Sequence, residues 1–222
     1  MEIKKYIFIF ILFPLVTSCS SVNENSRLKQ ITKSYLSKFE SKKEIVLKRK
    51  DIEDINYPLL EIKTNGVLQR SLMLRISFRD GYANYLSGTG QTLTLEGAAI
   101  TKTNGLDNEL ISLKISKNSP LVNLTKIENW PSKIKKSYGF LTPSYKIKNI
   151  NFNCVLENHE TKKIIIIDFE YKLTKVIETC SNPNLNFKNY YWVDNDGFVW
   201  KSNQWISPKG TIANLQILKK GI

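Results

Sequence analysis

The chain has 222 residues, enough for one sizeable domain or two small ones. Its formal net charge of +13 could suggest a nucleic-acid partner, but the sequence contains no nucleic-acid-binding motif. Anionic polysaccharide, lipopolysaccharide or phospholipid headgroups are better counter-charges, unless the positive charge is spread evenly and serves no specific partner.

Residues 1–18 have the layout of a bacterial export signal. Two lysines precede an apolar run from Tyr6 to Val16, and small or β-branched residues then lead to Cys19. This run is too short to span a bilayer, which needs about 20 apolar residues. Val16-Thr17-Ser18-Cys19 resembles a lipobox, so we expect cleavage before Cys19 and acylation of its thiol. Two or three acyl chains would form a durable membrane anchor.

The residues after the cysteine indicate where the protein resides and how the mature chain begins. Ser20 stands where lipoproteins retained in the inner membrane often carry Asp, so we expect an outer-membrane lipoprotein that faces the periplasm. Residues 19–25 are polar and predict a lipid-anchored tether. Residues 26–43 have an amphipathic helical pattern. Such a basic helix could lie on a membrane, although packing on the sheet of the domain is more usual.

From Ile45 onward the pattern predicts short strands separated by turn signals. Asp80-Gly81 suits the positive φ of a tight hairpin, and Asp194 to Gly197 predicts another hairpin turn. Residues 106–115 could form a short helix or a loop, and a turn is expected near residues 158–160. The expected strands cover residues 57–63, 67–78, 82–86, 91–95, 97–101, 145–157, 163–180, 189–193, 198–205 and a final stretch to 218.

Residues 26–222 are expected to form a single β-rich domain, with two lobes joined around residues 116–143 as the alternative. That segment contains three prolines and has no regular pattern. The succession of short strands predicts a mainly β fold. We expect an antiparallel β-sandwich or a partly open β-barrel, with an N-terminal amphipathic helix.

Cys154 and Cys180 remain once Cys19 carries lipid. In the oxidising compartment that the signal indicates, a disulfide between them is the expected state, and two separate buried thiols are the alternative. The closed loop of about 26 residues would contribute roughly 3.5 kcal/mol in the chain-entropy model.

No group of residues in the sequence points to catalysis, to a cofactor or to a metal. His159 is the single histidine, which excludes a histidine-rich metal site, and it is expected to be a solvated loop residue. No nucleophile elbow and no glycine-rich phosphate loop occurs. Asp194-Asn195-Asp196-Gly197 resembles the start of a calcium loop, but Asn203 stands where a glutamate is expected, so a hairpin turn is the better interpretation.

An aromatic cluster near the C-terminal end is the most unusual local feature. Strand alternation places Tyr190 and Trp192 on one face and Tyr191 on the other. Aromatic side chains can stack on sugars or anchor interfaces, whereas packing in the core is the alternative. The residues taken as a candidate binding surface are Tyr190, Trp192, Trp200, Gln204 and Trp205.

Two blocks of the sequence resemble the YjbF/GfcB family of lipoproteins. The first block is Arg79-Asp80-Gly81-Tyr82-Ala83-Asn84-Tyr85, followed by Gly90 to Gly97 and by Thr103 to Leu110. The second block is Tyr190-Tyr191-Trp192 with Asp196 to Pro208. The lipobox and the two later cysteines also fit this family, which is associated with group 4 capsule and exopolysaccharide production.

The resemblance implies a pathway rather than a catalytic mechanism, and it carries over no catalytic residues. The leading hypothesis is a non-enzymatic accessory in capsule or exopolysaccharide export or assembly. Its implied partner is an outer-membrane barrel protein of the same pathway, with polysaccharide as a further candidate ligand. The alternative is a periplasm-facing carrier or binding module that holds a lipid or glycan in a β-cavity. An apolar concave pocket would favour the carrier, whereas a filled core with an exposed apolar patch would favour the accessory.

Overall fold

A computed structural model describes residues 47–66, 70–106, 110–116, 119–142 and 144–220. The acylation site at Cys19 and the helix expected over residues 26–43 lie outside the described residues. Three short helices are present in the described part, namely η2 (Arg49–Asp51), α2 (Pro120–Asn123) and η3 (Ile127–Asn129). Across these ranges, none of the helices has the length and apolar content needed to cross a membrane.

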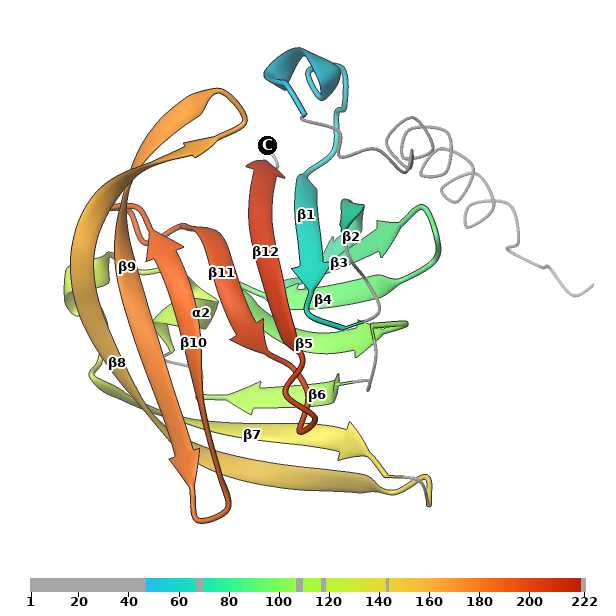
Figure 1. The fold of residues 1–222 in the computed structure, drawn as a ribbon, viewed down its shortest axis with the longest axis vertical. Helices are drawn as coiled ribbons and strands as arrows, with labels where there is room; N and C mark the ends of the chain where they lie inside the picture. The colour runs from blue at the N-terminus through green and yellow to red at the C-terminus, as the bar shows by residue number, and fades with distance from the viewer. Residues whose placement is uncertain (1–46, 67–69, 107–109, 117–118, 143, 221–222) are drawn as a thin grey trace, which may run out of the picture.

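A single antiparallel sheet of 12 strands dominates the described residues (Figure 1). Its order is β5-β4-β3-β2-β1-β12-β11-β10-β9-β8-β7-β6, so nearly every strand pairs with its neighbour in sequence. The strands are β1 (Leu59–Thr64), β2 (Ser71–Arg79), β3 (Tyr82–Ser87), β4 (Thr92–Glu96), β5 (Ala99–Asn104), β6 (Leu110–Ile115), β7 (Lys133–Leu141), β8 (Ile147–Ile166), β9 (Phe169–Asn182), β10 (Leu185–Val193), β11 (Val199–Trp205) and β12 (Ile212–Lys219).

The sheet curls until its two end strands, β5 and β6, lie beside each other, which makes a nearly closed barrel. The backbone amide of Leu110 at the start of β6 donates to Thr103 Oγ1 on β5, at 3.0 Å. Curling of this kind shields the polar edges that an open sheet would present. The predicted mainly β fold is confirmed. Of the two expected architectures, the sandwich and the partly open barrel, the structure has the barrel.

Three parts of the sequence form strands where the pattern indicated otherwise. Residues 110–115 are a strand and not a helix or loop, and Lys133–Leu141 is a strand within the segment that looked irregular. The turn expected near residues 158–160 is wrong, because β8 continues to Ile166. Its register shifts between Asn158 and Thr161, where a bulge bends the strand without ending it.

The main hydrophobic core lies inside the barrel. Alternate residues of each strand point inward, so β7 contributes Ile134, Tyr138 and Phe140 while β9 contributes Val176 and Cys180. The predicted disulfide is present, with Cys154 on β8 directly opposite Cys180 on β9. This bond joins the two longest strands of the sheet inside the main core.

A second core lies on the outer face of the sheet. Beyond its bulge, the β8–β9 hairpin folds over β11, β12 and β1, as the orange hairpin at the top left of Figure 1 shows. The segment around η2 packs there as well. The second core consists of Leu47, Ile52, Ile55, Leu59, Leu72, Leu74, Ile166, Leu173, Trp200 and Leu218.

Candidate functional site

The partly exposed outer face of β9, β10 and β11 carries aromatic, basic and amide side chains in two rows. In the first row Lys175, Trp192 and Lys201 are direct cross-strand partners. In the second row Tyr190 lies opposite Asn203, two residues further along the strands. Directly paired residues of antiparallel strands point to the same side of a sheet. We call the surface formed by these five residues the outer strip.

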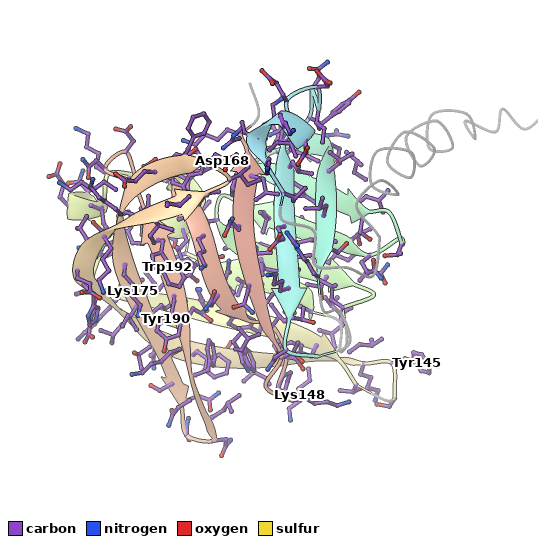
Figure 2. The ribbon with its side chains drawn as sticks, turned by 45° about the horizontal axis from the view of Figure 1, so that its top comes forward. Tyr145, Lys148, Asp168, Lys175, Tyr190 and Trp192 are labelled. Atoms are coloured by element: carbon purple, nitrogen blue, oxygen red, sulfur yellow. A yellow bond between two sulfur atoms is a disulfide. The ribbon has the colours of Figure 1, made fainter. Side chains whose placement is uncertain are left out.

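Lysine side chains cover the aromatic rings of the outer strip. Lys175 Nζ lies 4.9 Å from the ring centroid of Tyr190, and Lys201 Nζ lies 5.1 Å from that of Trp192. Figure 2 shows Lys175, Tyr190 and Trp192 together on the sheet below the hairpin tip, which Asp168 marks. Flat apolar faces beside ammonium groups suit an acidic sugar or an interface with an acidic rim.

The structure separates the five residues that the sequence suggested as a binding surface. Tyr190 and Trp192 are half-buried on the outer face, with Tyr191 inside the barrel as the alternation predicts. Trp200, Gln204 and Trp205 are only 8%, 3% and 3% exposed, so they are core residues and not surface residues.

Each of the three buried residues is held by a different part of the core. Trp205 packs against four aromatic rings, with its centroid 4.3 Å from that of Phe187. Gln204 accepts a hydrogen bond from the Ile100 amide and donates to the Ala98 carbonyl, which ties β11 to β5 and the turn before it. Trp200 lies in the second core, where Asp194 Oδ2 accepts from its indole nitrogen at 2.9 Å.

The turn between β10 and β11 is built by Asp194. Its Oδ1 accepts from the amides of Asp196 and Phe198, and Gly197 adopts a φ of +89°. A Cβ at Gly197 would lie 2.0 Å from the Thr125 carbonyl oxygen, so only glycine fits. Oδ1 therefore serves the hairpin turn that the sequence predicts, while Oδ2 accepts from the Trp200 indole and lies near Lys220. His159 is exposed but lies within β8 and not in a turn.

A buried ion pair crosses the inside of the barrel. Lys136 Nζ on β7 lies 2.7 Å from Glu178 Oε2 on β9, and both side chains are 0% exposed. The same carboxylate oxygen accepts hydrogen bonds from Asn189 Nδ2 and from the Tyr191 hydroxyl. Burial lowers the pKa of Lys136 and Glu178 opposes that change, whereas burial and then Glu178 raise the pKa of Tyr138 and Tyr191 well above its usual value.

The barrel has a cavity of about 330 Å³ at one end. Its walls are mainly apolar and come from β3, β4, β11, β12 and the turn between β4 and β5. The side chains that form the walls include Tyr85, Leu95, Ala98, Val199, Ser202 and Leu215. The partly or fully exposed part of the lining includes Arg75, Phe78, Phe198 and Lys220, and we call this part the mouth. This volume is at the lower end of the range for small-molecule sites.

Sequence patterns did not indicate the basic members of these sites. Lys175 and Lys201 lie beside aromatic rings of β10 only through the pairing of the strands, whereas Arg75 lies beside Phe78 of its own strand. For Lys175, the sequence signal is strand alternation, which places it on the same face of β9 as Ile177. No sequence motif marks Lys136 and Glu178 as a buried pair.

Comparison with known proteins identifies one family. Residues 32–218 match the model of the family described as group 4 capsule polysaccharide lipoprotein gfcB, YjbF. No curated protein matches the sequence. Among solved structures, the fold is similar to the crystal structure of the hypothetical lipoprotein YmcC from Escherichia coli (K12). The TM-score is 0.65 at 17% identity, and the similarity covers 78% of this chain and 89% of that chain.

Proposed function

Because the chain belongs to the YjbF family of group 4 capsule polysaccharide lipoproteins, we propose that it is a non-enzymatic accessory in the export or assembly of capsule polysaccharide or exopolysaccharide. It acts by binding, and the outer strip carries the binding. Its partner is an outer-membrane barrel protein of the pathway, and polysaccharide is the further candidate ligand. The observation behind this proposal is the outer strip, whose paired aromatic and basic side chains remain partly exposed.

The lipid anchor fixes where this binding occurs. Acylation of Cys19, followed by Ser20, would hold the domain at the outer membrane with the barrel in the periplasm. Mass spectrometry of protein extracted from the envelope should find an acylated N-terminus at Cys19. An unmodified N-terminus elsewhere in the chain would refute the anchor, and Cys19→Ala should block both acylation and cleavage.

The outer strip can be tested by removing its rings. Tyr190→Ala with Trp192→Ala should lower the amount of polysaccharide on the cell surface, because aromatic anchors of an interface each contribute about 2 kcal/mol or more. Since Trp192 also packs against the second core, the single change Tyr190→Ala is measured as well. Extraction from the envelope and circular dichroism check anchoring and folding.

Tyr145→Ala supplies the matched control for this experiment. Tyr145 is an exposed aromatic residue in the β7–β8 turn, on a different part of the barrel from the outer strip (Figure 2). Normal surface polysaccharide in folded, anchored strip variants would contradict a binding role for this surface. An equal loss in Tyr145→Ala would show that the effect is not specific to the strip.

A second candidate function is a binding module that holds a ligand in the barrel. The cavity supports it, since it is concave and mainly apolar and lies at the mouth of a β-barrel. The two functions are compatible because the rings of the strip, Tyr190 and Trp192, do not line the cavity, whereas Lys201 contributes to both.

A further inference from the structure

Arg75 is the polar group that distinguishes this cavity from an ordinary packing defect. It points into the barrel beside Tyr85, its direct cross-strand partner. Its guanidinium carbon lies 5.5 Å from the ring centroid of Phe78, which also lines the mouth. Burial raises the pKa of Tyr85 while the charge of Arg75 opposes this rise, so the phenol and the guanidinium share one environment.

The Arg75 side chain has no acceptor among the described residues. No carboxylate in those ranges lies within ion-pair distance, and no oxygen there accepts from its guanidinium nitrogens. A guanidinium carries five donors, and those of Arg75 are open to solvent at the cavity, where a ligand can reach them. An anion arriving at the mouth of the cavity would supply the missing acceptor.

Two other cations that line the cavity, Lys219 and Lys220, have polar partners. Lys219 Nζ donates to the carbonyl of Glu53 at 2.9 Å. Lys220 Nζ lies 3.8 Å from both Asp194 Oδ2 and the ring centroid of Phe198. They add positive potential around the opening, and so does Lys201, which lines the cavity and lies over the ring of Trp192. The apolar walls behind Arg75 would take a hydrocarbon and could not satisfy the many hydroxyls of a sugar.

We propose that the cavity binds a single-chain amphiphile with an anionic headgroup. The hydrocarbon chain lies between Tyr85, Leu95 and Leu215, and the phosphate or carboxylate accepts hydrogen bonds from the Arg75 guanidinium. This inference rests on the second candidate function and adds the chemical class of its ligand. A bidentate pairing with a planar guanidinium is the arrangement that arginine makes best with such anions.

The test uses the full lipidated protein in nanodiscs of phosphatidylcholine. A diazirine-bearing decyl phosphate is photolysed with the protein, and the labelled peptides are mapped by mass spectrometry. Peptides with Tyr85, Leu95 and Leu215 should be labelled. Arg75→Gln should lower this labelling about tenfold, or about 1.4 kcal/mol, because it removes a hydrogen bond to a charged group. Arg75→Lys should restore part of it.

Arg79→Gln is the matched control, since Arg79 is an exposed arginine on the same strand and pairs with Asp80 outside the cavity. Ala83→Leu should also lower labelling by filling the space. Equal labelling by a neutral diazirine-bearing decyl glucoside, with no effect of Arg75→Gln, would overturn the anionic headgroup but leave the second candidate function. Displacement of the probe by free glucuronate would mean that an acidic sugar binds, which overturns the amphiphile. Absence of labelling in the cavity would overturn both.

Discussion

At the residue scale, the buried pair of Lys136 and Glu178 is the feature with the largest expected effect on stability. Lys136→Met leaves the Glu178 carboxylate enclosed without its counter-charge, and breaking a buried pair in this way costs about 3–5 kcal/mol. Adding Glu178→Gln removes the remaining charge and still leaves an acceptor for Asn189 and Tyr191. The double variant should recover most of the loss, as measured by urea unfolding followed by tryptophan fluorescence.

Two outcomes would contradict the view that the uncompensated charge of Glu178 causes the loss of stability. A double variant as unstable as Lys136→Met would show that hydrogen bonds and packing, and not an uncompensated charge, account for the loss. A single variant as stable as the wild type would show that water reaches Glu178. The single and double variants can be compared in this way because the two side chains contact each other inside the barrel, so the effects of the two substitutions are not expected to add.

The same residue explains why β7 was difficult to predict. Its inward series is Ile134, Lys136, Tyr138 and Phe140, so a lysine interrupts the apolar alternation that identifies a strand. The partner that makes this lysine tolerable is on β9, 42 residues away. By contrast, Tyr190, Tyr191 and Trp192 alternate without interruption, and their faces were predicted correctly. The burial of Trp205 and Gln204 depends on strands from other parts of the chain and could not be read from their own neighbourhood.

At the element scale, the β8–β9 hairpin should stabilise the outer face of the sheet. Ile166 is 0% exposed and lies in the second core, whereas its neighbour Ile165 is 71% exposed. Ile166→Ala should therefore lower the free energy of unfolding by about 2–5 kcal/mol. Ile165→Ala is the control and should change it by no more than about 0.5 kcal/mol. Equal effects of the two substitutions in urea unfolding would mean that the hairpin tip does not pack on the sheet in solution.

Most strands were predicted from alternation and turn residues, while the path of this hairpin was not. Asp80-Gly81 has the positive φ values that its sequence indicated, and β2 and β3 follow on either side. In β8 the polar stretch around His159 looked like a turn, because a strand exposed on both faces loses its period-two signal. The turn is instead at Ile167 and Asp168, which both have positive φ. Asp commonly adopts positive φ but Ile rarely does, so little in the sequence indicates a turn there.

At the scale of the whole molecule, the barrel presents two surfaces with different chemistry. Among the described residues, the inside holds a dense core, an ion pair, a disulfide and a cavity. The outer face holds a second core and, beside it, the outer strip. The chain belongs to a family of group 4 capsule polysaccharide lipoproteins, and the role proposed for it requires binding alone.

Deletion of the protein tests the accessory role most directly, with surface and intracellular polysaccharide measured in the same cells while the pathway is expressed. If the protein supports export or assembly by binding, surface polysaccharide should fall while the intracellular precursor pool stays constant or rises. Expression of the wild-type protein in the deletion strain should restore the surface material. Normal surface polysaccharide in the deletion strain, or a matching fall in the precursor pool, would contradict the proposed role.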